Sequence, residues 1–163
     1  MNVNEYGSYT VYWKRVLWEN ALNADVLSED FELDEADYGK LSFPFLTGHG
    51  FILDGGECSG QILREANLLP SGNILHFRSW GSGLRFVFPD ETKVSAFGFD
   101  YQPSEDWRLI INNIIIDLPE GRKGFIGIVF FGNDPSKFSL TSLKNVQGGL
   151  SVDNISYVKS TLP

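Results

Sequence analysis

Apolar and polar residues alternate in short runs along most of the chain, and a period of two predicts β-strands. Residues 84–88 carry Leu and Phe at every second position, and residues 93–101 end with Phe, Phe and Tyr at the same spacing. The segment 124–131 is apolar at successive positions, which is typical of a central strand buried on both faces. The same patterns predict strands at residues 8–12, 26–33, 107–111, 114–118, 138–143 and 150–158.

One segment near the N-terminus has a helical period instead. Trp13, Leu17, Trp18, Ala21 and Leu22 fall on one face of a helix of about ten residues, and charged and polar residues occupy the other face. Residues 62–69 are ambiguous, because they fit a helical turn and the start of a strand equally.

Turn residues separate the predicted strands. Asn112-Asn113 has the form of a two-residue hairpin turn, residues 47–59 form a Gly-rich loop, and residues 34–37 an acidic turn. Strands that recur about every ten to thirteen residues, with turns between them, are typical of antiparallel sandwiches. We therefore predict an all-β fold, an antiparallel β-sandwich with one short N-terminal helix, in a single domain over residues 1–163.

The last predicted strand breaks its own alternation. Leu150 and Val152 share one parity, whereas Ile155 and Tyr157 have the other, so a regular strand cannot bury all four on one face. A β-bulge near Asp153-Asn154 would restore the register. Because bulges often re-aim a polar side chain beside a site, the pattern draws attention to Asp153.

Composition narrows the range of partners. The net charge of −8 argues against nucleic acid, which needs an excess of Lys and Arg, and disfavours anionic membranes. No run approaches the roughly 18 to 20 apolar residues of a membrane helix, so no membrane insertion is expected. Cys58 is the only cysteine, which excludes an intramolecular disulfide and a thiolate metal cluster.

Five phrases occur in an order that resembles a family of bacterial exported β-sandwich proteins, which often end in a sorting tail of the PEP-CTERM type. The match spans about residues 13 to 158, and the chain ends at Thr161-Leu162-Pro163 without the sorting tail. The phrases are Arg15-Val16-Leu17-Trp18-Glu19-Asn20-Ala21-Leu22, Ser28-Glu29-Asp30-Phe31-Glu32, Val94-Ser95-Ala96-Phe97-Gly98-Phe99-Asp100-Tyr101, Gly124-Phe125-Ile126-Gly127-Ile128 and Gly149-Leu150-Ser151-Val152-Asp153-Asn154-Ile155-Ser156-Tyr157.

The resemblance implies a jelly-roll-like module of the carbohydrate-binding kind, also similar to MAM-like jelly rolls, in an extracellular or cell-surface location. In such modules two acidic segments placed like residues 30–32 and 153–155 here, one near each end of the chain, frequently hold a structural calcium ion. The N-terminus, residues 1–5, lacks the basic and apolar regions of a signal peptide. It therefore fits a cytoplasmic protein, or a mature fragment with a new start methionine.

The carboxylates of these two segments suit calcium, which takes six to eight oxygen ligands. Glu32 and Asp153 are the best candidates, Asp30 is a third, and Asp100 is a weaker one. A regular strand over residues 26–33 would place Asp30 and Glu32 on the same face. The alternative is that these two belong to a solvated acidic edge and that Asp153 caps a turn.

Aromatic side chains are the second class of candidate, because their flat faces stack on sugar rings. Trp80, Tyr101 and Trp107 are the aromatics best placed to reach a loop or an open face. For each of them the alternative is an ordinary core residue, since most aromatics in a sandwich are core. Trp13 and Trp18 are expected to pack the helix.

No motif indicates a catalytic centre, and we predict no catalytic residues. The carboxylates of residues 29–37 offer the pair that glycoside hydrolysis needs, but no aromatic cleft motif accompanies them. His49 and His76 are too few and too far apart in sequence to indicate a metal centre or a triad. The predicted function is a non-catalytic module that binds a carbohydrate or a cell-surface component. A structural or adhesive protein acting through protein–protein contacts is the alternative, and a glycoside hydrolase is the second.

Overall fold

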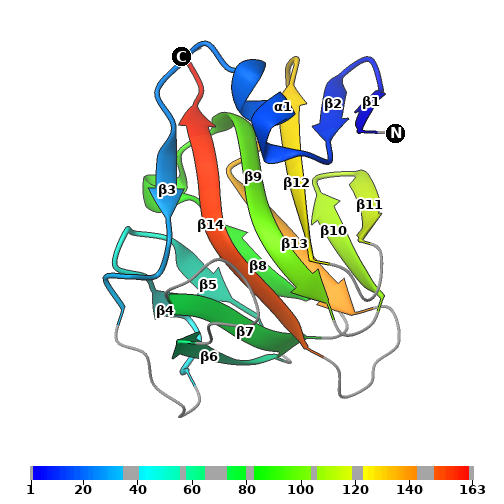
Figure 1. Cartoon of the computed structure of the whole chain (residues 1–163). Helices are drawn as coiled ribbons and strands as arrows, with labels where there is room; N and C mark the ends of the chain where they lie inside the picture. Colours follow the sequence, from blue (N-terminus) through cyan, green and yellow to red (C-terminus); the bar gives the residue numbers. More distant parts are fainter. Residues whose placement is uncertain are drawn as a thin grey trace.

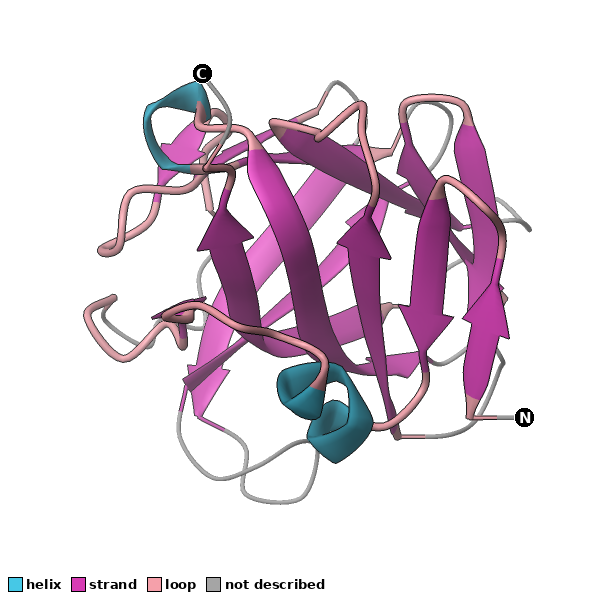
Figure 2. Ribbon diagram, turned by 90° about the horizontal axis from the view of Figure 1, so that it is seen from above, coloured by secondary structure: helices cyan, strands magenta, loops and turns pink. Residues whose placement is uncertain are grey.

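The computed structural model describes residues 2–34, 41–55, 58–64, 73–79, 83–103, 106–118, 123–142 and 149–161. The strands of these segments form two antiparallel sheets packed face to face (Figures 1 and 2). The predicted all-β sandwich with a short N-terminal helix is confirmed.

The larger sheet contains the first and last strands of the chain. β3 (Leu27–Glu29) lies off its main path and pairs with β14. β12 lies between β2 and β9, which confirms the predicted central strand. The order of the main path is β1 (Val3–Glu5), β2 (Tyr9–Tyr12), β12 (Gly124–Phe130), β9 (Val94–Pro103), β14 (Leu150–Lys159), β7 (Asn73–Ser79) and β6 (Cys58–Arg64).

The smaller sheet includes the predicted hairpin, whose turn residue Asn112 has the positive φ of 52° that such turns need. Its order is β11 (Ile114–Leu118), β10 (Trp107–Ile111), β13 (Lys137–Ser142), β8 (Leu84–Val87), β5 (Ile52–Asp54) and β4 (Phe45–Leu46). Sequence analysis placed the start of β6 in a loop and left its end open between a helical turn and a strand, and it missed β1, β4 and β5 altogether. These three strands have two or three residues each, too few to show an alternation, and β5 falls in the segment predicted as a loop.

Aromatic rings fill the space between the sheets. Phe97 and Phe99 of β9 and Phe138 of β13 are at most 1% exposed, and the rings of Phe97 and Phe138 stack with centroids 4.6 Å apart. Phe88, which precedes the 3₁₀ turn η1 (Pro89–Glu91), packs against the same group. The alternation predicted for residues 84–88 and 93–101 therefore does face the core.

The N-terminal helix, α1 (Arg15–Asn20), is shorter than predicted. Trp13 still belongs to the β1–β2 hairpin, because its backbone N–H donates to Asn2 O at 2.8 Å. Trp18 is fully buried and donates from Nε1 to Ile128 O, so α1 covers part of the outer face of the larger sheet (Figure 1). Gly127 makes this approach possible, since a Cβ there would lie 2.5 Å from the Trp18 ring. Among the described residues, no helix has the length and hydropathy needed to cross a bilayer.

The predicted bulge in β14 is confirmed. Asp153 pairs with Asp100 of β9, but Ser156 pairs with Gly98, so β14 contains one extra residue between these positions. Asn154 adopts a φ of 50° at this point. The shift in register buries residues 150, 152, 155 and 157 together, as the parity break requires.

Candidate functional site

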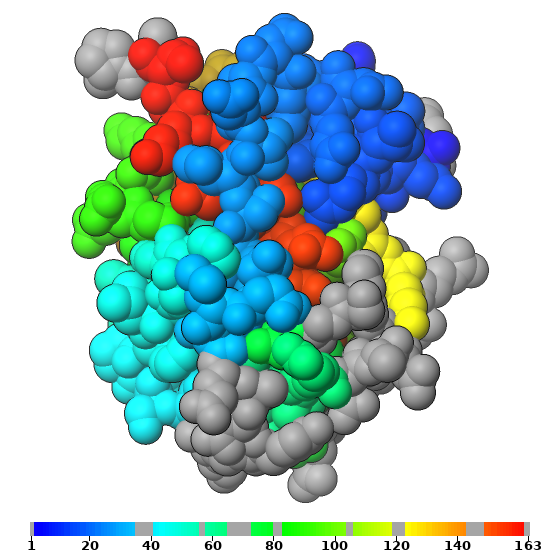
Figure 3. Space-filling model, turned by 60° about the vertical axis from the view of Figure 1, so that its left-hand side comes forward, coloured from blue at the N-terminus to red at the C-terminus, as the bar shows by residue number. Residues whose placement is uncertain are grey.

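The two acidic segments of the sequence meet at the bulge of β14. β3 pairs with β14 at residues 155–157, and β7 pairs with it at residues 150–152. Asp153 and Asn154 therefore lie between these two stretches of pairing. Figure 3 shows the blue N-terminal part of the chain lying against the red C-terminal strand.

The predicted strand over residues 26–33 is wrong beyond Glu29. The chain turns at Phe31, which has a φ of 62° and a fully buried ring. Glu32 N donates to Asp30 Oδ1 at 3.1 Å, a local turn that competes with strand pairing. Asp30 and Glu32 are therefore not on one face of a strand, which was the geometric reason for grouping them as metal ligands.

Asn73, at the start of β7, anchors this turn. Its side-chain amide donates to Phe31 O at 3.0 Å and to Asp34 O at 2.8 Å. Its backbone N–H donates to Glu32 Oε1 at 2.6 Å. The turn after β3 is thereby tied to the strand that flanks the bulge on its other side.

Asp153 is buried in an acidic environment. Its side chain is 3% exposed, and its Oδ1 accepts the backbone N–H of Asn154 at 2.8 Å. Burial raises the pKa of Asp153 to about 8; the Asn154 N–H opposes this shift, and the charges of Asp100, Asp30 and Glu32 add to it. The charges of two of the predicted metal ligands, Asp30 and Glu32, therefore act on the third, Asp153, but the three do not form a group with the ligand spacing of a metal site.

Arg15 neutralises one side of this group. Its NH2 lies 3.3 Å from Asp100 Oδ2 and donates to Asn154 O at 3.0 Å, while its NH1 donates to Ser156 Oγ. The guanidinium also lies over the Phe125 ring, 4.6 Å from the centroid. Among the described residues no basic side chain comes within 4.0 Å of Asp153, so the ionised form of Asp153 has no such partner.

A second group of donors lies at the end of β3. Glu29, Asp30 and His49 place ligand atoms within 4.8 Å of one another, a spacing compatible with a metal ion. Glu29 is 0% exposed. Its carboxylate oxygens accept hydrogen bonds from the backbone N–H groups of His49 at 3.2 Å and Phe31 at 3.0 Å. The ring atom His49 Nδ1 lies 2.7 Å from Glu29 Oε2. Sequence analysis dismissed His49 because the two histidines are few and far apart in sequence. The contact that brings His49 to Glu29 spans 20 positions along the chain and leaves no local pattern.

A polar row crosses the outer face of the larger sheet. Gln61 of β6 is paired with His76 of β7, His76 with Ser151 of β14, and Ser151 with Gln102 of β9. His76 Nδ1 lies 2.8 Å from Ser151 Oγ. Burial, and secondarily the charge of Arg78, lower the pKa of His76, so the imidazole is neutral near pH 7.

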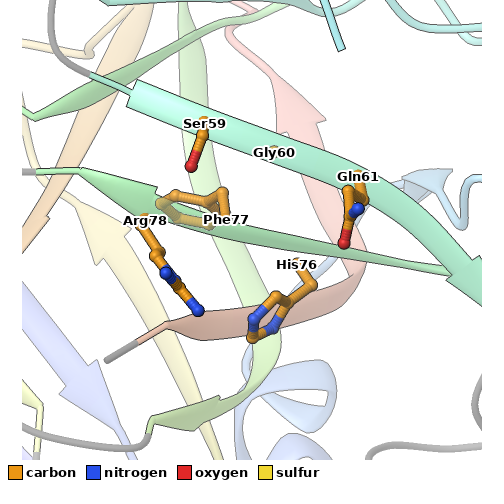
Figure 4. Close-up of a pocket in the computed structure, with 6 residues that line it drawn as sticks. All are labelled: Ser59, Gly60, Gln61, His76, Phe77 and Arg78. Atoms are coloured by element: carbon orange, nitrogen blue, oxygen red, sulfur yellow. The ribbon is translucent and has the colours of Figure 1, made fainter. Parts of the chain in front are cut away.

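The β6–β7 end of this row opens into a pocket of about 240 Å³ (Figure 4). Gln102, further along the row, has a buried Oε1 with no hydrogen-bond partner among the residues that the structure describes. Buried polar atoms are normally hydrogen-bonded, and this acceptor is an exception at the far end of the row. The pocket is lined by Ser59, Gly60, Gln61, His76, Phe77 and Arg78.

Two of the predicted ligand-binding aromatics are core residues. Tyr101 is 3% exposed and Trp107 is 0% exposed, with the Trp107 ring packed edge-on against Phe77 at 5.3 Å. A ring enclosed in this way has no face for a sugar, and the prediction is corrected for both residues. Trp80 lies outside the described residues.

The fold is similar to that of the CBM22-1 xylan-binding domain from Paenibacillus barcinonensis Xyn10C. The TM-score is 0.51 at 14% identity, covering 88% of this chain and 100% of that domain. The likeness is one of fold: this chain and that domain share a β-sandwich. A mutant of CBM29-2, a family 29 carbohydrate-binding module, gives a TM-score of 0.39 at 11% identity over 82% of this chain and 91% of that one.

No family model and no curated protein matches the chain. The part of the resemblance that names exported PEP-CTERM-type proteins is therefore not confirmed. The part that implies a sandwich of the carbohydrate-binding-module type is confirmed at the level of the fold.

Proposed function

We propose that the protein is a non-catalytic carbohydrate-binding module that holds a glycan on the outer face of its larger sheet. The observation that carries the proposal is the polar row from Gln61 to Gln102, which crosses four neighbouring strands beside an open pocket. Sugar hydroxyls donate and accept hydrogen bonds, and amide and imidazole side chains offer both functions.

The location of this row supports the proposal. α1 covers the part of the outer face near Phe125 and Ala96, whereas the described residues of the row lie on β6, β7, β9 and β14 away from that cluster. Ser151 is 2% exposed, and its hydroxyl is hydrogen-bonded to the His76 ring. These two side chains of the row are therefore already ordered and lose little conformational entropy on binding. On this proposal the protein meets its ligand at the cell surface or outside the cell.

The proposal is tested by affinity electrophoresis against a panel of neutral and acidic polysaccharides. A Gln61→Ala/Gln102→Ala double variant should weaken binding about thirtyfold, because two hydrogen bonds at roughly 1 kcal/mol each are lost. Ser139→Ala, on the outer face of the smaller sheet, is the matched control and should bind normally. Concentration-dependent assembly without binding to any polysaccharide would favour the adhesive alternative, and release of reducing sugar would favour a hydrolase.

We further propose that the carboxylates at the bulge hold a calcium ion. All four groups there, Asp30, Glu32, Asp100 and Asp153, offer hard oxygen donors of the type that calcium prefers. The ionised form of the buried Asp153 is repelled by three other carboxylates and has no basic partner within 4.0 Å in the described part of the chain, and a divalent cation would offset that repulsion. Among the described residues, Glu29, Asp30 and His49 are the group whose ligand atoms already lie within 4.8 Å of one another, so calcium at the bulge requires the four carboxylates there to move closer together when the ion binds.

A further inference from the structure

Arg78 differs from the other arginines that the structure describes. It is exposed on β7 at the edge of the pocket (Figure 4) and makes no ion pair with any described residue. Each of the others is within 4.0 Å of a carboxylate, at distances of 2.9 to 3.8 Å: Arg15, Arg64, Arg85 and Arg108.

The two strands that line the pocket also carry no acidic residue. Neither β6 (Cys58–Arg64) nor β7 (Asn73–Ser79) contains Asp or Glu, and residues 150–152 of β14 contain none. In a chain with a net charge of −8, Arg78 is thus the one Arg, Lys, Asp or Glu among the described residues that line the pocket.

The remaining pocket residues suit the neutral part of a sugar. Ser59 and Gln61 face the pocket from β6 (Figure 4), and both offer hydrogen-bond donors and acceptors. The His76 ring lies against Gly149, where a Cβ would come within 2.5 Å of its Cε1 and Nε2, so the ring is held in place beside Arg78.

We infer that the glycan bound in this pocket is an acidic polysaccharide, and that Arg78 binds the carboxylate of a uronic acid residue while Ser59 and Gln61 bind neighbouring hydroxyls. The inference rests on the proposed function. A planar guanidinium matches a carboxylate with two parallel N–H···O bonds, which makes Arg78 the specificity-determining residue for acidic over neutral sugars.

The test compares polygalacturonate with the same polymer after its carboxylates are reduced to primary alcohols. Affinity electrophoresis should show that wild-type protein binds the acidic polymer about tenfold or more tightly. Arg78→Gln should bind the two polymers alike, with the affinity that wild type has for the reduced one. Arg108→Gln removes the same charge from the outer face of the smaller sheet and should keep the wild-type preference.

Three results would overturn the inference. Equal binding of both polymers by wild-type protein would do so and leave the proposed function standing. An equal loss in Arg78→Gln and Arg108→Gln would show attraction by overall charge rather than a site at Arg78. Failure to bind any polysaccharide of the panel, acidic or neutral, would overturn the inference and the proposed function together.

Discussion

Asp153 of β14 lies directly opposite Asp100 of β9, two carboxylates paired across neighbouring strands. Like charges in this position destabilise a sheet unless something compensates them. Arg15 and the side-chain amide of Asn154 compensate Asp100, at 3.3 and 3.0 Å from its Oδ2. Asp153 instead keeps its proton to higher pH. The bulge places Asp153 where the charges of Asp30 and Glu32, from the N-terminal acidic segment, also act on it.

This relationship predicts how stability depends on pH in EDTA. The pKa of Asp153 is about 8 in the folded protein, against 3.8 for an ordinary Asp, so the folded state retains a proton that the unfolded state has released. The contribution of Asp153 to the free energy of unfolding is therefore largest below pH 4 and falls as pH rises to about 8, by up to about 1.4 kcal/mol per pH unit.

Asp153→Asn should remove this component. Urea denaturation at several pH values between 5 and 8 would show a shallower decline for Asp153→Asn than for wild type, whereas Asp117→Asn on the smaller sheet should follow wild type. Identical pH profiles for Asp153→Asn and wild type would show that Asp153 ionises normally.

Calcium should raise the melting temperature if the bulge holds it. An ion present at about 100 times its dissociation constant stabilises the folded state by about 2.7 kcal/mol. Asp153→Asn and Asp30→Asn should lose most of this increase, and Asp117→Asn should retain it. A differential scanning fluorimetry titration that leaves the wild-type melting temperature unchanged would eliminate the calcium site.

The Glu29–His49 contact should be important for stability. His49→Ala removes the 2.7 Å partner of a carboxylate that is 0% exposed, and we expect a loss of about 1 to 3 kcal/mol in the free energy of unfolding at pH 7. His49→Gln, which retains a donor, should recover part of the loss. Chemical denaturation of the three proteins measures this, and a wild-type value for His49→Ala would refute it.

Trp107 should matter for packing and not for binding. Trp107→Ala leaves a cavity in the core and should cost about 3 to 5 kcal/mol, whereas Trp107→Phe should fold and bind polysaccharide normally. Trp80→Ala, by contrast, is predicted from the sequence to weaken binding. A folded Trp107→Phe protein that no longer binds the polysaccharide would restore Trp107 as a ligand residue.

The sequence predicted those parts of the fold that local pattern determines. The parity break between Val152 and Ile155 located the bulge, and the alternation at residues 84–88 and 93–101 identified core faces. The pattern failed at Phe31, where tertiary burial of the ring and a hydrogen bond to Asn73 override the apparent strand.

The polar row from Gln61 to Gln102 was beyond sequence analysis for a different reason. Gln61, His76, Ser151 and Gln102 come from four strands that are distant in sequence, and their meeting depends on the order β6–β7–β14–β9. Alternation predicts which residues share a face of one strand, but it does not predict which strands are neighbours. The contact between Glu29 and His49 was hidden for the same reason.

The most direct test of the central claim is to map the ligand by NMR. An oligosaccharide from the polysaccharide that retards the protein most strongly is titrated into ¹⁵N-labelled protein. We predict that the largest amide shift changes fall at residues 59–61, 76–78, 102 and 151, with none at residues 108–117 of the smaller sheet. Saturating changes confined to the smaller sheet, with residues 59–61 and 76–78 unaffected, would contradict the account.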